Sequence, residues 1–186
     1  MGHGGDVIAE LTTDHREVEE LFARIEALPP GDARRRELTD AAVRELVRHS
    51  VAEEMYLYPA VRSALPDGDR VADKEIADHS GAERTMKDLE SLDAGVPEFD
   101  RLVRELIAEV RAHIRDEEDT LFPRLRESTT PDDLAKLGEQ VRRAKSIAPT
   151  RPHPSSPSTP PANKLLAPGA GMVDRLRDAL TGRGKD

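Results

Sequence analysis

Apolar residues recur every three to four positions along most of the chain up to about residue 127, which is the spacing of one helical face. The pattern predicts four amphipathic helices separated by breaks rich in proline, glycine and aspartate. Because short connections join long helices, the predicted fold is all-α, an up-down-up-down four-helix bundle. The expected helices span about residues 6–28, 33–64, 69–93 and 98–127, and a short fifth one about 131–145.

The two halves of this predicted bundle repeat each other at an offset of 64 residues. The bundle is therefore expected to consist of two copies of one helical hairpin. Four of the six histidines belong to the repeat, and only His3 and His153 lie outside it. The repeated polar and proline positions are His15 with His79, His49 with His113, Glu53 with Glu117, Glu54 with Glu118, and Pro59 with Pro123.

The composition changes near residue 147, which divides the chain into a bundle with its fifth helix, 1–146, and a proline-rich tail, 147–186. Seven of the 14 prolines lie between Pro149 and Pro168, so that stretch is expected to be extended. A short amphipathic helix is expected near the end, at about 172–180. From residue 144 onward, seven Lys and Arg stand against three Asp and Glu, so the tail either lies on the acidic body or extends freely.

The repeat places histidines and carboxylates together on the faces that point into the bundle. Residues four apart share a helical face, so His49 lies beside Glu53 and His113 beside Glu117. Buried carboxylates need partners, and several of them at one depth with imidazoles are most simply satisfied by metal. Mixed imidazole and carboxylate ligands suit iron or manganese better than structural zinc or calcium. The alternative is a metal-free bundle that serves as an interaction module.

These residues carry a resemblance to a known family. His15, His49-x-x-x-Glu53, His79 and His113-x-x-x-Glu117, with the prolines after them, resemble the haemerythrin-like, or His-His-Glu cation-binding, domain over about residues 6–127. The resemblance implies a centre of two non-haem iron ions with an oxo or hydroxo bridge. It also implies that Glu53 and Glu117 bridge the two ions and that the histidines are terminal ligands.

One position departs from the oxygen-carrying members of that family. They have a fifth histidine four residues after the one on the third helix, where this chain has Glu83. Glu83 is expected either to ligate iron or to be a solvated surface acid. As a ligand it would favour Fe(III), which makes reversible O₂ carriage less favourable than redox chemistry on hydrogen peroxide. The implied function is then a catalase- or peroxidase-like oxidoreductase; the alternative is an O₂, NO or iron binding or sensing protein without turnover.

Composition narrows the class of protein further. The net charge of −9 argues against unaided nucleic-acid binding, which needs clustered Lys and Arg. The absence of cysteine excludes disulfides and thiolate metal sites. No apolar run approaches the length of a membrane span, and no secretory signal is evident, so a cytoplasmic location without membrane association is expected. The expected partners are therefore small molecules, and the sequence indicates no protein partner.

Overall fold

The computed structural model describes residues 3–181, which form helices and connecting segments without a β-strand. This agrees with the all-α class predicted from the sequence. Most of the helices carry an apolar stripe that is buried against the others. In chain order the elements are α1 (Val7–Glu26), α2 (Ala33–Ala52), the π-helix η1 (Glu53–Leu57), α3 (Tyr58–Ala64), α4 (Gly68–Leu89), α5 (Pro97–Asp116), the π-helix η2 (Glu117–Leu121), α6 (Phe122–Ser128), α7 (Pro131–Ile147) and α8 (Ala162–Thr181).

Local sequence signals set where several helices begin. The Asp6 carboxylate accepts a hydrogen bond from the Ala9 backbone N–H at 2.9 Å, which caps the first turn of α1. Asp32 and Thr130 cap α2 and α7 in the same way through their own side chains. Gly31, with a φ of 80°, takes the left-handed conformation in the turn between α1 and α2, which side chains other than glycine adopt rarely. The turn and its cap together place α2 alongside α1.

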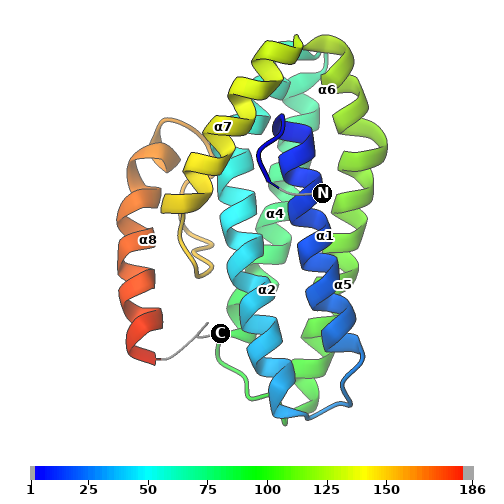
Figure 1. Ribbon diagram of the computed structural model, residues 1–186. Helices are drawn as coiled ribbons and strands as arrows, with labels where there is room; N and C mark the ends of the chain where they lie inside the picture. The colour runs from blue at the N-terminus through cyan, green and yellow to red at the C-terminus, as the bar shows by residue number, and fades with distance from the viewer. Residues whose placement is uncertain (1–2, 182–186) are drawn as a thin grey trace.

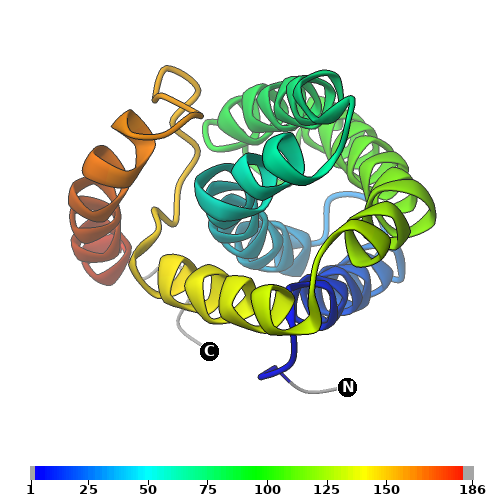
Figure 2. The same ribbon diagram turned by 90° about the horizontal axis from the view of Figure 1, so that it is seen from above.

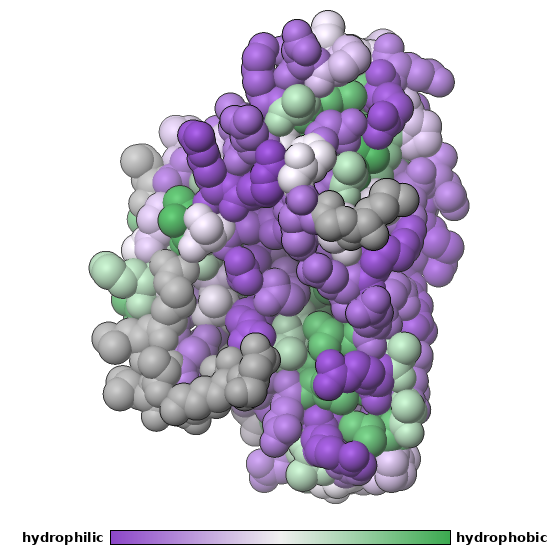
Figure 3. All heavy atoms as spheres, viewed as in Figure 1, coloured by the Kyte–Doolittle hydropathy of each residue, from purple (hydrophilic) through white to green (hydrophobic). Residues whose placement is uncertain are grey.

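Four long helical rods lie side by side: α1, α2 continued by η1 and α3, α4, and α5 continued by η2 and α6 (Figure 1). Their buried apolar residues form two clusters at different heights along the rods. On α1, for example, Leu11 belongs to one cluster and Val18 to the other, and His15 lies between them. The polar centre is thus held between two apolar cores. The face shown in Figure 3 is mainly hydrophilic, in keeping with the high charge content.

A π-turn interrupts the second and fourth rods at equivalent places, which the sequence pattern did not predict. The Tyr58 N–H bonds to the Glu53 carbonyl, five residues back, and the Phe122 N–H bonds to the Glu117 carbonyl in the same way. The next residue in each case is proline, which has no N–H to donate and crowds the carbonyl four residues earlier. The helix accommodates this by widening its preceding turn. Each π-turn begins at one of the two expected bridging glutamates.

Helix α7 lies across the bundle against α1 and α2, and α8 lies outside the four rods (Figures 1 and 2). The tail is therefore docked over the described residues, which decides between the two arrangements expected for it. Its helix is also longer than the expected 172–180 and includes Pro168. Gly171 allows α8 to pack closely against the end of α7, because a Cβ there would lie 2.4 Å from the Ile147 carbonyl oxygen. Residues 182–186 of the tail lie outside the described range.

Asp174 ties α8 to the segment of the tail that precedes it. It is 1% exposed, and its carboxylate accepts hydrogen bonds from the backbone N–H groups of Thr150 and Arg151, at 3.2 and 3.1 Å. The ring of His153 adds a third bond of 2.9 Å. Within residues 3–181, no helix is both long and apolar enough to cross a membrane.

The histidine in this attachment should titrate above its ordinary range. The hydrogen bond to Asp174 raises the pKa of His153 above 6.5, while partial burial and Lys87 oppose the shift and Glu83 supports it. This contribution to the fold of the tail is complete below pH 6.5 and is lost as the pH rises through the raised pKa. Nuclear magnetic resonance titration of the His153 ring should show the elevated pKa, and Asp174→Asn should return it to the ordinary range. An unshifted pKa in the wild-type chain would contradict the contact between His153 and Asp174.

Candidate metal centre

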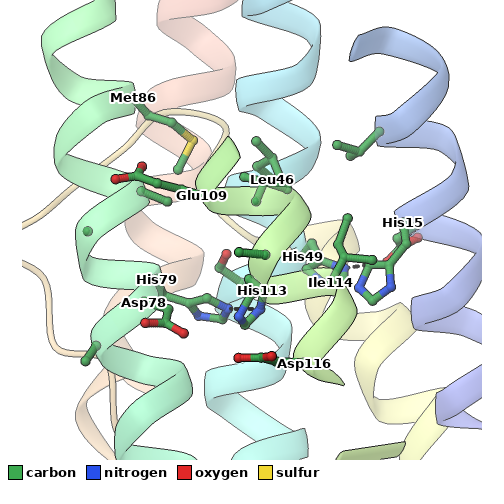
Figure 4. A pocket seen from close by; sticks show the side chains of 18 residues that line it. His15, Leu46, His49, Asp78, His79, Met86, Glu109, His113, Ile114 and Asp116 are labelled. Atoms are coloured by element: carbon green, nitrogen blue, oxygen red, sulfur yellow. Dashed lines mark hydrogen bonds and ion pairs between the residues drawn. The ribbon is translucent and has the colours of Figure 1, made fainter. Parts of the chain in front are cut away.

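Four histidines and two glutamates converge in the middle of the bundle. Two His-x-x-x-Glu pairs come from α2–η1 and α5–η2, and α1 and α4 contribute one histidine each. All six belong to the set expected from the sequence, and they come from both hairpins. Figure 4 shows the four histidines. Their ligand atoms form two overlapping groups, in each of which the atoms lie within 4.8 Å of one another. The groups are His15, His49, Glu53 and Glu117, and Glu53, His79 and His113.

In the first group, both histidines come from the N-terminal hairpin. His49 Nε2 lies 3.1 Å from Glu53 Oε1, and His15 Nε2 lies 3.4 Å from Glu117 Oε2. The two histidines are 5% and 2% exposed, and both glutamates are completely buried. Such a set of buried nitrogen and oxygen donors can hold one metal ion.

In the second group, both histidines come from the C-terminal hairpin. His79 Nε2 lies 3.3 Å from Glu53 Oε2 and 3.1 Å from His113 Nε2. His113 Nε2 lies 3.7 Å from Glu117 Oε2. Glu53 therefore directs one oxygen to each group, and Glu117 approaches a histidine of each. Both carboxylates are placed as a bridge between two positions would be.

The inward-facing atoms of the first group are better suited to bind a metal ion than to form hydrogen bonds with one another. His15 Nε2, His49 Nε2, Glu53 Oε1 and Glu117 Oε2 are buried and make no well-formed hydrogen bond. A buried polar atom without a partner costs free energy, and so many at one point are rare in native proteins. Imidazole nitrogens and carboxylate oxygens are suitable ligands for iron or manganese. The residues present thus fit a dinuclear metal centre.

Each histidine also has a carboxylate at its outer nitrogen, Nδ1. This arrangement orients the ring and leaves Nε2 free to bind metal. Two of these carboxylates, Glu54 and Glu118, repeat in the sequence directly after Glu53 and Glu117, and the other two are Asp14 and Glu75. The pairs are His15 with Glu118 at 2.8 Å, His49 with Asp14 at 3.1 Å, His79 with Glu54 at 3.1 Å and His113 with Glu75 at 3.0 Å.

Protons compensate these charges when metal is absent. Burial lowers the pKa of His79, but hydrogen bonding to Glu53 and Glu54 outweighs it and raises this pKa to about 10. Burial raises the pKa of Glu53, but His49 and His79 hold it well below its ordinary value. The metal-free centre thus pairs imidazolium with carboxylate. Metal binding must displace these protons, so it should release acid.

Glu83 does not join either group. It is half-buried on α4, and its Oε1 accepts a hydrogen bond from the His153 backbone N–H at 2.7 Å. The structure therefore places the Glu83 carboxylate against the tail, and its role as an iron ligand stays a prediction. Its repeat mate Glu19 pairs with Arg111 at 3.0 Å, away from the ligands.

Tyr58 contributes a hydroxyl to the second group, although its repeat mate Phe122 favoured a purely apolar role. Its Oη lies 3.0 Å from His79 Nε2 and 3.3 Å from Glu117 Oε1. Burial and the surrounding carboxylates raise the pKa of Tyr58 well above 10, so the hydroxyl stays protonated. Phe122, in contrast, stacks on the ring of His15 with 5.8 Å between centroids. The two halves of the centre therefore differ in chemistry although they repeat in sequence.

Removing this hydroxyl should change reactivity more than metal content. Tyr58→Phe should fold and retain metal, since phenylalanine occupies the equivalent place in the other hairpin. If Tyr58 supplies a proton, reaction with peroxide should slow by about 100-fold. Tyr56→Phe is the matched control, because Tyr56 lies under Lys164, at 4.2 Å from ring centroid to Nζ. Equal rates in both variants, measured by peroxide consumption at equal iron content, would exclude such a role.

A cavity of about 310 Å³ adjoins the centre, and all four histidines line it. Its lining includes the apolar side chains of Val18, Leu46, Met86 and Val110. Asp78, Glu109 and Asp116 also line it, and Figure 4 shows Asp78 and Asp116 close to His79 and His113. The cavity can admit a small molecule to the histidine side of the centre, and its acidic residues disfavour anions.

Comparison with known proteins decides the family. A model described as Hemerythrin HHE cation binding domain matches residues 6–125. The chain belongs to this family. An uncharacterized hemerythrin-like protein of Schizosaccharomyces pombe is 29% identical over 168 residues, covering 90% of this chain and 82% of that protein. Membership agrees with the resemblance in the ligand motifs.

Two further relatives of this hemerythrin-like chain were found. A protein of Nostoc sp. named DNA nickase is 31% identical over 138 residues, which cover 73% of this chain but only 38% of that longer protein. The crystal structure of a hemerythrin HHE cation binding domain-containing protein from Mycobacterium kansasii superposes with a TM-score of 0.66 at 22% identity. It covers 76% of this chain and 85% of the other, and this likeness supports the fold.

Some residues of the centre escaped the sequence reasoning for identifiable reasons. Glu75 lies one turn before His79, on the same face, so its spacing was a usable signal. Asp14 directly precedes His15 and does repeat, as Asp78, but Asp78 pairs with Lys74 and not with a histidine. The repeat therefore indicated the ligands and included Glu54 and Glu118. The other two outer carboxylates, Asp14 and Glu75, have no equivalent partner of a histidine in the other hairpin.

Proposed function

We propose that this hemerythrin-like chain holds two iron ions in an up-down-up-down four-helix bundle and uses them for redox chemistry on hydrogen peroxide. The observation that carries the proposal is the shared position of Glu53 and Glu117 between two pairs of histidines, beside a cavity that small molecules can occupy. When bound, a pair of iron ions supplies two-electron oxidation and reduction at one place. Disproportionation balances as two H₂O₂ giving two H₂O and one O₂.

The residues of the chain support this chemistry in distinct ways. The outer carboxylates orient the imidazoles and, being anionic, favour the higher oxidation state of a bound metal. This disfavours a persistent diferrous state, which reversible O₂ carriage requires. Glu83 is not counted among these carboxylates, because its Oε1 accepts a hydrogen bond from the His153 backbone. Tyr58 holds a proton at Oη, within 3.5 Å of the Glu53 carboxylate and closer to that of Glu117.

The cavity favours a small neutral oxidant. Hydrogen peroxide is uncharged at neutral pH, so the acidic residues Asp78, Glu109 and Asp116 do not repel it. The same cavity also supports the second candidate function, binding of O₂ or NO without turnover, because apolar side chains form part of its lining. The two candidate functions share the centre and differ in whether the bound molecule is converted or released unchanged.

The test compares turnover with binding on one preparation. Protein loaded anaerobically with iron should consume hydrogen peroxide and release O₂ over many cycles, as measured with an oxygen electrode. His113→Ala protein treated in the same way controls for loosely bound iron. If peroxide is left unchanged while O₂ or NO produces a stable, reversible change in the visible spectrum, the binding function replaces the proposed one.

A further inference from the structure

The four outer carboxylates of the centre differ in their cationic neighbours. On the side of His15 and His49, each carboxylate has a basic partner. Glu118 forms an ion pair with Arg16, and Asp14 forms one with Lys145 of α7. Lys145 is 11% exposed in its side chain and also contacts Glu10 at 3.0 Å, and Glu10 has a second cation in Arg142 at 3.4 Å. The charge on this side is therefore balanced.

The side of His79 and His113 lacks this balance. Among the described residues, no Lys or Arg lies within 4.0 Å of Glu54, whose ion-pair partner is His79. Glu75 has only Lys74, at 3.4 Å. That ammonium group lies closer to two other acids, Asp116 at 2.6 Å and Asp78 at 2.9 Å. One exposed cation thus serves three carboxylates, and a fourth has none.

Charge of this kind acts strongly on a buried metal ion, because screening is weak inside the protein. We propose that the two metal positions are unequal and fill in order. The position of His79 and His113 binds first and more tightly, and that of His15 and His49 binds second. The inference rests on the two-ion centre proposed above, but not on which reaction it performs.

The hydroxyl of Tyr58 lies on the same side as the unbalanced carboxylates. It approaches His79 Nε2 at 3.0 Å, whereas Phe122 at the repeated place offers His15 only an apolar ring. The position expected to fill first therefore also has one more oxygen donor nearby. This is a second difference between the positions, and it acts in the same direction as the charge.

Titration of the metal-free chain with Mn(II) tests the order of filling without using catalysis. Electron paramagnetic resonance of the free ion counts the ions bound and separates a tight from a weak step. Glu54→Gln should weaken the tight step by about 10- to 100-fold. Glu118→Gln, the equivalent change in the other hairpin, should leave the tight step unchanged and weaken only the second. Both changes are close to isosteric.

Arg16→Gln gives the converse test at a half-exposed position that folding can tolerate. It removes the balancing cation from Glu118, so the weak step should become tighter, by about tenfold. If Glu54→Gln and Glu118→Gln weaken the same step equally, or if Arg16→Gln leaves both steps unchanged, the positions are not ordered by these charges. Binding of only one ion by the wild-type chain would instead overturn the two-ion centre itself.

Discussion

Replacing Glu53 with alanine is expected to leave the chain without either iron ion. Its two oxygens lie 3.1 Å from His49 Nε2 and 3.3 Å from His79 Nε2, so a single change removes a ligand from both positions. It also removes buried negative charge that would balance the charge of the two cations. Elemental analysis after anaerobic iron loading measures the result. Glu117→Ala, the repeated position, should behave in the same way.

Two acids that the structure places elsewhere serve as controls for that experiment. Glu19→Ala should retain iron, since Glu19 pairs with Arg111 at the surface. Glu83→Gln should also retain iron while it loosens the tail, because its carboxylate holds the backbone of His153. Loss of iron in Glu83→Gln would show that Glu83 is a ligand after all. Full iron content in Glu53→Ala would show that Glu53 does not bridge.

Removal of iron is expected to lower the stability of the whole bundle. A ligand that binds only the folded state stabilises it by about 4 kcal/mol when its free concentration is about 1,000 times its dissociation constant. For a chain of this size, that corresponds to a fall in the unfolding midpoint of roughly 8–16 °C. Calorimetry of iron-loaded and chelator-treated protein measures the difference. The metal-free chain should still fold, since its imidazoles take up protons and balance the carboxylates.

The same measurement on His113→Ala provides the matched comparison. This variant lacks a ligand of one position, so iron should stabilise it much less than it stabilises the wild type. His3→Ala, outside the repeat, should keep the full effect, because His3 contacts Glu10 and Glu17 and not the ligands. An identical midpoint with and without iron in the wild-type chain would mean that the metal contributes nothing to the fold.

The helices and the six converging ligands could be predicted because both depend on local spacing. A histidine and a glutamate four residues apart must share a helical face, and a repeat of 64 residues must place equivalent faces at equivalent depth. The prediction of His49 and Glu53 as neighbours therefore required no information about tertiary contacts. Glu83 has the same spacing from His79, but spacing gives no information about the tail, whose His153 backbone donates a hydrogen bond to its carboxylate.

The π-turns and the docking of the tail could not be predicted from local spacing. Proline at residues 59 and 123 indicated a kink, but whether a helix bends or widens by one residue depends on what packs around it. In the tail, a stretch dense in proline indicated extended chain. Pro168 nevertheless lies within α8, where neighbouring Ala167 packs against the apolar core and supports the helix. Tertiary packing, which the sequence pattern does not reveal, decided both cases.

In the proposed two-ion centre, the crossed positions of Glu53 and Glu117 would make each metal ion a cross-link between the two hairpins. Each hairpin provides both histidines for one ion and lends a carboxylate to the other. If one ion leaves, the remaining ion still ties the first half of the chain to the second. Separation of the hairpins in the loaded protein is therefore a two-stage event, and the second ion must leave before the halves can part.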